Sequence, residues 1–277
     1  MSSQDNTVTQ GQLNSNMNTV IHTKAPPSAK LFAPADTHYK STDITFFDGS
    51  VRKFYYRENT SDLAVIQLIL ISKQYDLGRL RRSSELKGFL QRKRMTGKTP
   101  LIIDAGANIG ASAIYFLSAV PDAQIVAIEP ETGNFQLLAL NTAGLRVETL
   151  RAAVSSTHGM ARVIDPGEGH WGYRTQNINE ADPGTAVPRF TINEIYRRHA
   201  TQCFPLIVKI DIEGGESDLF SANTEWVVAT PILIIELHDK FLLKSANSRT
   251  FLQCVAHLNR DFVYIGEDIY SIANDLD

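Results

Sequence analysis

Beyond residue 100, short apolar runs alternate with stretches in which apolar residues recur at helical spacing. The apolar runs predict buried strands, and the helical spacing predicts helices that pack on a sheet. The expected strands span 101–104, 124–129, 146–154, 206–211 and 232–237, and the expected helices span 111–119, 132–142, 192–199 and 249–260. Two further runs, 262–265 and 269–272, flank Gly266-Glu267-Asp268 and predict an edge hairpin. The alternation is typical of an α/β fold with a mostly parallel sheet and helices on both faces.

The chain before residue 100 shows other patterns. Residues 1–38 are rich in Ser, Asn, Gln and Thr, so we expect a disordered or loosely packed segment. Residues 39–98 are expected to form a small hairpin and helical cover, and residues 99–277 the main α/β domain. The hairpin is predicted from β-like runs at 43–47 and 51–57 around Asp48-Gly49, and Ser61 or Asp62 can cap a helix that runs to about Tyr75. A polar, glycine-rich insertion extends from 155 to about 188.

Composition narrows the class of protein. The chain has 277 residues, of which 43% are hydrophobic and 21% charged, as expected for a globular protein with one large core. Its two cysteines do not suggest a disulfide framework, and no signal pattern or membrane-spanning run is present, so we expect a cytoplasmic protein outside the membrane. The net charge of −3 implies no general affinity for nucleic acid.

Residues 79–98 depart from this neutral balance. They contain eight Lys and Arg residues against one acidic residue, Glu85. Such a run usually forms a solvated helical face. The alternative is a patch that meets an anionic acceptor, such as a phosphate-bearing substrate.

The first candidate site follows the strand 101–104. A dinucleotide fingerprint needs Gly-x-Gly-x-x-Gly, but after Gly106 the second glycine position holds Asn108 and the third holds Ala111. Asp104 would repel a diphosphate, whereas it suits a ligand with a cationic amino-acid tail. S-adenosylmethionine is such a ligand: Asp104 would face its ammonium group, Gly106 would allow its close approach, and Glu129, after the next strand, would accept its ribose hydroxyls. The competing interpretation is that Asp104 caps the next helix and Glu129 is an ordinary strand-end residue.

The second candidate site follows two later strands. Asp211 and Glu213 come two residues apart, as do Glu236 and His238, and ligands of open α/β sheets bind beyond the carboxyl ends of the strands. We therefore expect these residues to converge with Asp104 on one crevice. A histidine near carboxylates can act as a general base. His238 can instead be a hydrogen-bonded structural histidine, and Glu213 a helix N-terminal acid. The spacing matches no defined metal motif, so we expect no metal, although such a cluster can hold a divalent ion.

Four segments, DAGANIG, AIEPE, KIDIEGGE and IIELH, resemble in order and spacing the FkbM-type S-adenosylmethionine-dependent methyltransferases. The resemblance covers roughly residues 98–240 and departs from the usual pattern at Gly215, where a bulky residue is common. It implies a class I methyltransferase fold with strand order 3-2-1-4-5-7-6, and O-methylation of a sugar or of a polyketide- or peptide-derived natural product. The implied cofactor contacts are Asp104, Gly106, Asn108, Glu129 and Ala153. The implied catalytic residues are His238, Asp211 and Glu213, with His238 or Asp211 as the base and Glu213 orienting it.

Other functions stay open on the sequence alone. A methyltransferase acting on nucleic acid or on another small molecule is one alternative, although no Pro-Pro-aromatic motif follows the fourth strand. A non-catalytic cofactor-binding module is another. A nicotinamide-dependent oxidoreductase is disfavoured by Asn108 and Asp104. In the insertion, Trp171 and Tyr173 can either stack on the ligand or anchor the loop. We expect a small-molecule acceptor as the partner, and the sequence is compatible with an oligomer.

Overall fold

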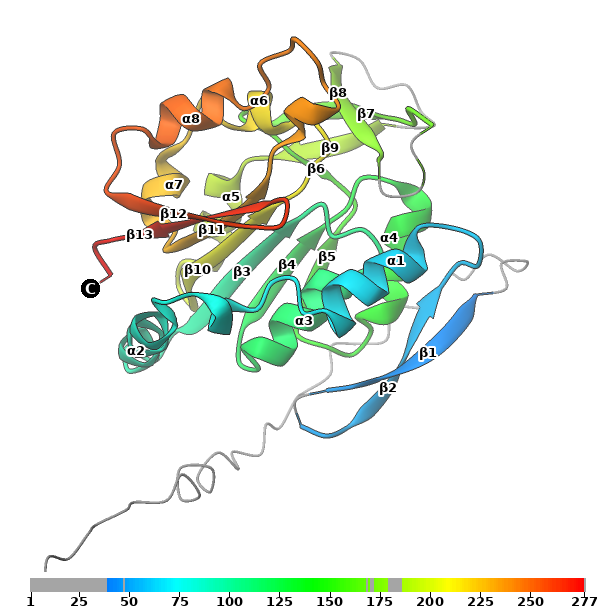
Figure 1. The fold of residues 1–277 in the computed structure, drawn as a ribbon, viewed down its shortest axis with the longest axis horizontal. Helices are drawn as coiled ribbons and strands as arrows, with labels where there is room; N and C mark the ends of the chain where they lie inside the picture. The colour runs from blue at the N-terminus through cyan, green and yellow to red at the C-terminus, as the bar shows by residue number, and fades with distance from the viewer. Residues whose placement is uncertain (1–38, 47, 168, 170–171, 179–185, 277) are drawn as a thin grey trace, which may run out of the picture. The chain divides into compact units, whose positions relative to one another are not determined.

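The computed structural model describes residues 39–46, 48–167, 169, 172–178 and 186–276. Its main sheet has seven strands in the order β12-β13-β11-β10-β3-β4-β5 (Figure 1). These strands are β3 (Thr99–Ala105), β4 (Gln124–Ile128), β5 (Val147–Leu150), β10 (Cys203–Ile210), β11 (Ile232–Glu236), β12 (Arg260–Ile265) and β13 (Asp268–Ala273). All neighbours pair in parallel except β13, which is antiparallel to both β11 and β12. Counted along the chain within this sheet, the order is 3-2-1-4-5-7-6, which confirms the predicted order and the edge hairpin.

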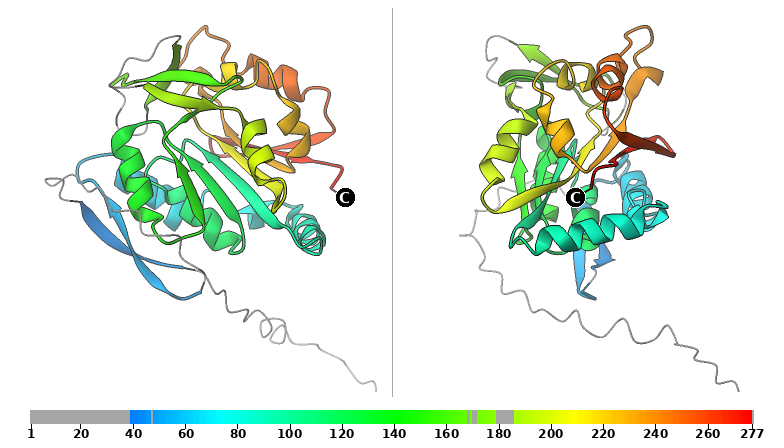
Figure 2. Two further views of the ribbon diagram at one scale, coloured as in Figure 1. Left: turned by 180° about the vertical axis from the view of Figure 1, so that it is seen from behind. Right: turned by 90° about the vertical axis from the view of Figure 1, so that its left-hand side faces the viewer.

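Helices cover both faces of this sheet (Figures 1 and 2). They are α3 (Ala111–Ala119), α4 (Thr132–Asn141), α5 (Ile192–His199), α6 (Glu216–Leu219), α7 (Glu225–Ala229) and α8 (Arg249–Val255). Strand β3 shows how its residues alternate between the two faces: Ile102 belongs to the apolar cluster that includes α3 and α4 side chains. Its neighbours Leu101 and Ile103 belong to the cluster that includes side chains of α5, α7 and α8. The predicted α/β architecture is therefore confirmed.

The segment before β3 contains a two-stranded antiparallel hairpin, β1 (Lys40–Thr45) with β2 (Val51–Tyr56), as predicted. It also contains α1 (Asp62–Ile66), a π-helical turn η1 (Gln67–Ile71), a short 3₁₀ turn η2 (Leu77–Arg79) and α2 (Ser83–Arg94). The single helix expected from Asp62 to Tyr75 is wrong, because the turn ends before Lys73, whose φ is 53°. Ser61 occupies the N-cap position, one of the two expected, but its side chain makes no cap bond, and the Asp62 carboxylate pairs with Arg57 at 2.8 Å. The segment 1–38 lies outside the described residues.

A second, four-stranded sheet replaces the expected insertion. It contains β6 (Ala153–Val154), β7 (Gly159–Ile164), β8 (Arg174–Ile178) and β9 (Ala186–Phe190) in the order β6-β9-β7-β8. The strand expected over 146–154 is therefore wrong, because the chain leaves β5 and pairs again as β6 with β9. Residues 152–154 resume the apolar pattern directly after Arg151, so periodicity alone did not reveal the break. The short alternation around Ala161, which is fully buried, was the unused signal for β7.

Two further findings concern the rest of the chain. The helix expected over 249–260 ends at Val255, and Arg260 begins β12, where its guanidinium donates to the carbonyls of Thr230 and Ser271 at 2.9 and 2.8 Å. Cys203 and Cys254 are both free thiols, as the sequence suggested. Among the described residues, no helix has the length and hydropathy needed to cross a membrane.

Candidate active site

A cavity of about 470 Å³ opens beyond the carboxyl ends of β3, β4, β10 and β11. Residues that directly follow or end these strands line it, among them Gly106, Glu129, Asp211 and Glu236. Polar and apolar walls meet in this space. The cavity is also lined by Val65, Leu68, Ile69, Tyr75, Asn108, Ser112, Asn134, Ala153, Tyr173, Lys209, Glu213, Lys240, Phe241 and Glu267.

At one end of the cavity, the turn after β3 is held by Glu129. The backbone N–H of Asn108 donates to Glu129 Oε2 at 2.9 Å, and the N–H of Glu131 donates to Oε1 at 2.9 Å. Asn108 adopts a left-handed φ of 48°, a conformation that asparagine tolerates better than most residues. Its buried Oδ1 has no hydrogen-bond partner among the described residues. This cofactor end, defined as Gly106, Asn108, Glu129 and Ala153, therefore presents an acceptor whose bonding capacity is unused.

Burial controls the charge of Glu129. Its side chain lies in the wall of the cavity, and burial raises its pKa to about 7, although the two backbone amides favour the ionised form. A carboxylate of this kind changes its charge near neutral pH.

Gly106 is required for a reason that differs from the expected close approach of a ligand. Its φ is +79°, and a Cβ at this position would lie 1.7 Å from the carbonyl oxygen of Asp211. The two strand ends touch here, because the Asp211 N–H donates to the Ala105 carbonyl at 3.1 Å. Only glycine fits this contact between the ends of β3 and β10.

Asp104 is fully buried and does not line the cavity. Its Oδ2 accepts a hydrogen bond from Ser112 Oγ at 2.5 Å, and its Oδ1 lies 3.4 Å from Lys209 Nζ. Of the residues expected to converge on the crevice, Asp104 and His238 lie behind the wall, whereas Asp211, Glu213 and Glu236 line the cavity. Ser112, which does line the cavity, separates Asp104 from the open space.

Lys209 is a site residue that sequence reasoning missed. Its ammonium donates to the Gly106 carbonyl at 2.7 Å and lies 3.4 Å from a carboxylate oxygen of Asp211 as well as of Asp104. Burial alone would lower the pKa of Lys209, but Asp211 and Asp104 outweigh it and raise the pKa above its usual value. The available signal was a lysine inside the apolar run of a buried strand, since such a charge needs partners.

Ala153 lines the cavity together with its neighbours Ala152 and Val154. Tyr173, which directly precedes β8 of the second sheet, lines it as well. Trp171, the other aromatic residue singled out in the insertion, lies outside the described residues.

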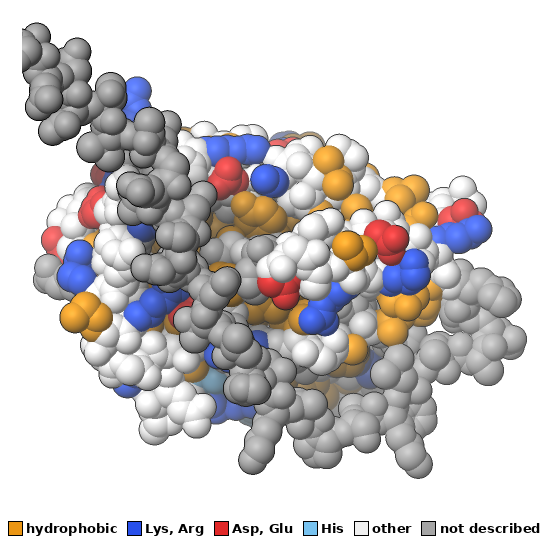
Figure 3. Space-filling view, turned by 90° about the horizontal axis from the view of Figure 1, so that it is seen from below, with side chains coloured by type: hydrophobic (Ala, Val, Ile, Leu, Met, Phe, Trp, Pro, Cys, Tyr) orange, Lys and Arg blue, Asp and Glu red, His pale blue; other side chains and the backbone are white. Residues whose placement is uncertain are grey.

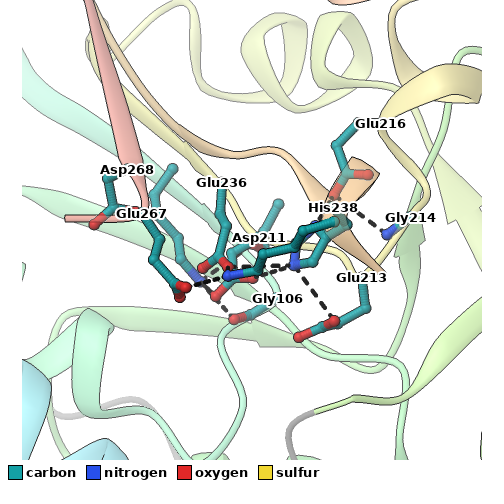
Figure 4. A network of polar contacts seen from close by, with 12 residues as sticks. Gly106, Asp211, Glu213, Gly214, Glu216, Glu236, His238, Glu267 and Asp268 are labelled. Carbon is teal, nitrogen blue, oxygen red and sulfur yellow. Dashed lines mark hydrogen bonds and ion pairs between the residues drawn. The ribbon is translucent and has the colours of Figure 1, made fainter. Parts of the chain in front are cut away.

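At the other end of the cavity, three carboxylates surround one histidine (Figure 4). His238 Nε2 lies 3.3 Å from Glu213 Oε2, 3.6 Å from Asp211 Oδ1 and 3.7 Å from Glu236 Oε1. We call Asp211, Glu213, Glu236 and His238 the carboxylate–histidine cluster. Its members follow β10, end β11 or begin the 3₁₀ turn η3 (His238–Lys240), so the expected convergence of these four residues is what the fold produces.

The cluster carries an excess of negative charge. Burial and the charge of Asp211 raise the pKa of Glu213 to about 7, and the same two causes raise that of Glu236 to about 7. Burial alone would lower the pKa of His238, but its hydrogen bond to Glu216 and the charges of Glu216 and Asp211 raise it to about 9. The imidazole is therefore protonated at neutral pH in this form of the protein.

A buried shell supports His238 from behind. Its Nδ1 lies 2.9 Å from Oε1 of Glu216, which is fully buried, and Glu216 Oε2 accepts a hydrogen bond from Asn247. The sequence did not predict Asn247, and it assigned no role to Glu216, which ends the segment KIDIEGGE. A glutamate and an asparagine next to polar turns carry no pattern that distinguishes them from surface residues.

Residues of the first helical turns complete the cavity. Val65, Leu68, Ile69 and Tyr75 line it, so part of the segment 39–98 contributes to the wall. The basic residues that follow are largely engaged within the chain: Arg82 pairs with Glu85 and Asp261, and Arg94 pairs with Asp122. On the face drawn in Figure 3, the Lys and Arg side chains are interspersed with acidic and apolar ones. These contacts favour the structural interpretation of the run 79–98 over an anion-binding patch.

A family model and a curated relative match parts of this chain. The family description "Methyltransferase FkbM domain" matches residues 104–257, which include the turn after β3 and the whole carboxylate–histidine cluster. A curated relative, "Methyltransferase sdnD" from Sordaria araneosa, is 41% identical over 64 residues, which are 22% of this chain and 25% of that protein. The matched stretch thus spans about a quarter of the relative's length.

Similar solved structures are also methyltransferases by their descriptions. The bifunctional kinase-methyltransferase WbdD, in its monomeric crystal structure, matches with 13% identity and a TM-score of 0.39, over 79% of this chain and 42% of that one. A putative caffeoyl-CoA O-methyltransferase from Staphylococcus aureus matches with 15% identity and a TM-score of 0.36, over 78% of this chain and 94% of that one.

Proposed function

The chain belongs to the FkbM methyltransferase family, and from that premise we propose that it transfers a methyl group from S-adenosylmethionine to a hydroxyl group of a sugar or natural-product acceptor. The observation that carries this proposal is the pairing, in one cavity, of a ribose-type carboxylate at Glu129 with a carboxylate–histidine cluster at the other end. When bound, S-adenosylmethionine supplies a methyl group on a cationic sulfur, which becomes a neutral thioether once the acceptor oxygen has taken the methyl group.

The cofactor end fits such a ligand. A volume of about 470 Å³ falls within the range of small-molecule sites. Glu129 would accept the ribose hydroxyls, and the unpartnered Asn108 Oδ1 would accept a further donor of the ligand. Ala153 would contact the adenine. Asp104 would act through Ser112, which lies between it and the cavity.

The acceptor would lie at the carboxylate–histidine cluster. Asp211 and Glu213 line the cavity, whereas His238 does not, so the carboxylates are the groups that can reach a hydroxyl proton. We assign proton acceptance to Asp211, with Glu213 orienting the acceptor. His238 would position both carboxylates through its Nε2, since its Nδ1 is held by Glu216. The proton leaves the acceptor oxygen for Asp211 as that oxygen bonds to the methyl carbon.

A calorimetric titration tests the cofactor part first. We expect saturable binding of S-adenosylmethionine and none of NAD, because Asn108 stands where a pyrophosphate would pack. Incubation with S-adenosylmethionine and a panel of hydroxylated sugars and macrocyclic natural products, followed by mass spectrometry, tests the transfer. A mass gain on amino rather than hydroxyl groups would overturn the O-methyl assignment. Binding of NAD alone would overturn the methyltransferase proposal.

A further inference from the structure

We propose that the carboxylate–histidine cluster binds a divalent metal ion. One ligand atom each from Asp211, Glu213 and His238 lie within 4.8 Å of one another, and Figure 4 shows the carboxyl groups turned toward the imidazole. Spacing along the chain did not predict this site. The fold creates it by bringing the ends of β10 and β11 together.

The distances around His238 Nε2 fit a coordination polyhedron better than a set of hydrogen bonds. Its separations from Glu213, Asp211 and Glu236 oxygens are 3.3, 3.6 and 3.7 Å, whereas N–H···O hydrogen bonds lie near 2.9 Å. Ligands about 2.1 Å from a common ion are separated by roughly 3.0 Å in octahedral geometry and roughly 3.4 Å in tetrahedral geometry. The three distances from Nε2 lie within about 0.7 Å of these separations, and the ligand atoms of Asp211, Glu213 and His238 all lie within 4.8 Å of one another.

The other imidazole nitrogen supplies an independent observation. Nδ1 lies 2.9 Å from the fully buried carboxylate of Glu216, which in turn accepts a hydrogen bond from Asn247. Metal-bound histidines usually donate their second N–H to a carboxylate in this way, which fixes the tautomer and aims the free nitrogen at the ion. His238 is itself 2% exposed, and among the described residues no hydrogen bond to Nε2 is formed. Nε2 thus faces the cluster, where an entering ion would displace the proton that this nitrogen carries in the metal-free protein.

The negative charge of the cluster also supports a metal site. Lys209 lies 3.4 Å from Asp211, and Lys240 lies 3.4 Å from Glu236. Within the described chain, Glu213 has no cationic partner at ion-pair distance apart from His238. A divalent cation would balance this charge. A set of carboxylate oxygens with one imidazole nitrogen suits Mn²⁺ and its first-row neighbours.

The ion would lie where the proposed function locates the acceptor. A hydroxyl group that coordinates a divalent ion has a lowered pKa and a fixed position. This catalytic role rests on the proposed methyl transfer, whereas binding of the ion does not. The two can therefore fail separately.

The experiment uses the full chain, stripped with a chelator, dialysed and titrated with Mn²⁺. Free Mn²⁺ is followed by electron paramagnetic resonance and total binding by calorimetry. We expect one ion per chain. Glu213→Gln and His238→Gln should each weaken binding by about 10–100-fold or more, and Glu216→Gln by about 10-fold. Glu148→Gln, which changes a carboxylate that contacts His199 and does not line this cavity, is the matched control and should bind as the wild type does.

The outcomes of this experiment distinguish failure of the metal site from failure of the proposed function. Absence of Mn²⁺, Mg²⁺ and Zn²⁺ binding, or equal affinity in the wild type and in a folded Glu213→Gln variant, would overturn the metal site. The same samples are titrated with S-adenosylmethionine. Metal binding without cofactor binding would support the site while removing the proposed function. Cofactor binding without metal binding would leave the proposed function intact and return the cluster to proton transfer by Asp211.

Discussion

The two ends of the cavity are built by different means. At the cofactor end, Glu129 is held by backbone N–H groups of Asn108 and Glu131, so turn geometry positions the carboxylate. At the carboxylate–histidine cluster, side chains face one another at 3.3 to 3.7 Å around His238. At the cofactor end, backbone N–H groups hold one carboxylate, whereas at the cluster three carboxylates lie close to one another around a histidine.

This difference indicates different tasks. Backbone amides cannot be repositioned without refolding the turn, so the first end is suited to recognising an invariant ligand. Carboxylates that lie close together repel one another when ionised, and a bound cation or proton relieves this repulsion. The second end is therefore suited to chemistry. Variants at the two ends should separate binding from turnover.

The largest effect is expected for His238→Ala. Removing the imidazole releases Asp211 and Glu213 and any ion they share, so turnover at saturating cofactor should fall by roughly 10²–10⁴-fold. Affinity for S-adenosylmethionine, measured by calorimetry, should stay within about threefold, because the change lies at the opposite end. His257→Ala, at an exposed histidine on the same chain, is the control. Unchanged turnover would remove His238 from the chemistry.

Gly106→Ala tests the point where the two ends touch. A Cβ there would meet the Asp211 carbonyl oxygen at 1.7 Å in addition to the strained φ of +79°. Gly97 shares the φ of +79° but has no atom within 4 Å, so Gly97→Ala isolates the conformational cost. We expect a loss of about 1–2 kcal/mol in the free energy of unfolding for Gly97→Ala. Gly106→Ala should lose at least about 3 kcal/mol by denaturant melts, because the backbone must also move. Equal losses would show that the contact with Asp211 relaxes freely.

The same contrast explains what the sequence could predict. Apolar runs and their order predicted the main sheet, because each strand is a local pattern that ends in a visible turn. Glu129 and Gly106 stood out for the same reason. The break between β5 and β6 did not, since the apolar pattern resumes at Ala152, directly after Arg151, while the pairing partner changes from β4 to β9.

The cluster was predicted only in part, again for a physical reason. The four residues at the ends of β10 and β11 follow from the rule that parallel strands end at one edge. Glu216 and Asn247 approach from beyond those strands, and their contacts depend on how α6 and the chain before α8 pack. The sequence shows a lysine at position 209 but did not predict its role, because two of its partners, Asp104 and the Gly106 carbonyl, lie in and directly after another strand, β3. Such long-range contacts leave no local pattern.

Glu129→Ala should affect the cofactor end alone. Loss of a charge-assisted hydrogen bond costs about 1.5–3 kcal/mol, which corresponds to about 10–100-fold weaker binding of S-adenosylmethionine. Turnover at saturating cofactor should change by no more than severalfold, in contrast to His238→Ala. Calorimetry gives the cofactor affinity and steady-state kinetics gives the turnover of Glu129→Ala and His238→Ala. Wild-type cofactor affinity in the folded Glu129→Ala variant would refute the ribose assignment.

The smallest predicted effect is a pH dependence confined to Glu129. Its pKa is raised to about 7 by burial, against the two amide hydrogen bonds. Ribose hydroxyls donate better to the ionised carboxylate, so cofactor affinity should be highest above pH 7. Between pH 8 and pH 6 it should fall by up to about 10-fold, since one pH unit below the pKa costs about 1.4 kcal/mol to ionise the group. Glu129→Gln, which cannot ionise, should lose this component and keep only the pH dependence that the ligand, Glu213 and Glu236 contribute to both proteins.

The ligand-free protein should show the opposite sign. Because the folded pKa of Glu129 lies above the ordinary value of 4.5, the folded state holds its proton longer than the unfolded state. The stability from this group is therefore complete below pH 4.5 and is lost as the pH rises through 7. The free energy of unfolding of the wild type, measured relative to Glu129→Gln, should decline over that interval while cofactor affinity rises. Parallel changes in the two quantities would mean that Glu129 does not meet the ligand as an ionised acceptor, and the cofactor end would then owe its affinity to Asn108 and the backbone alone.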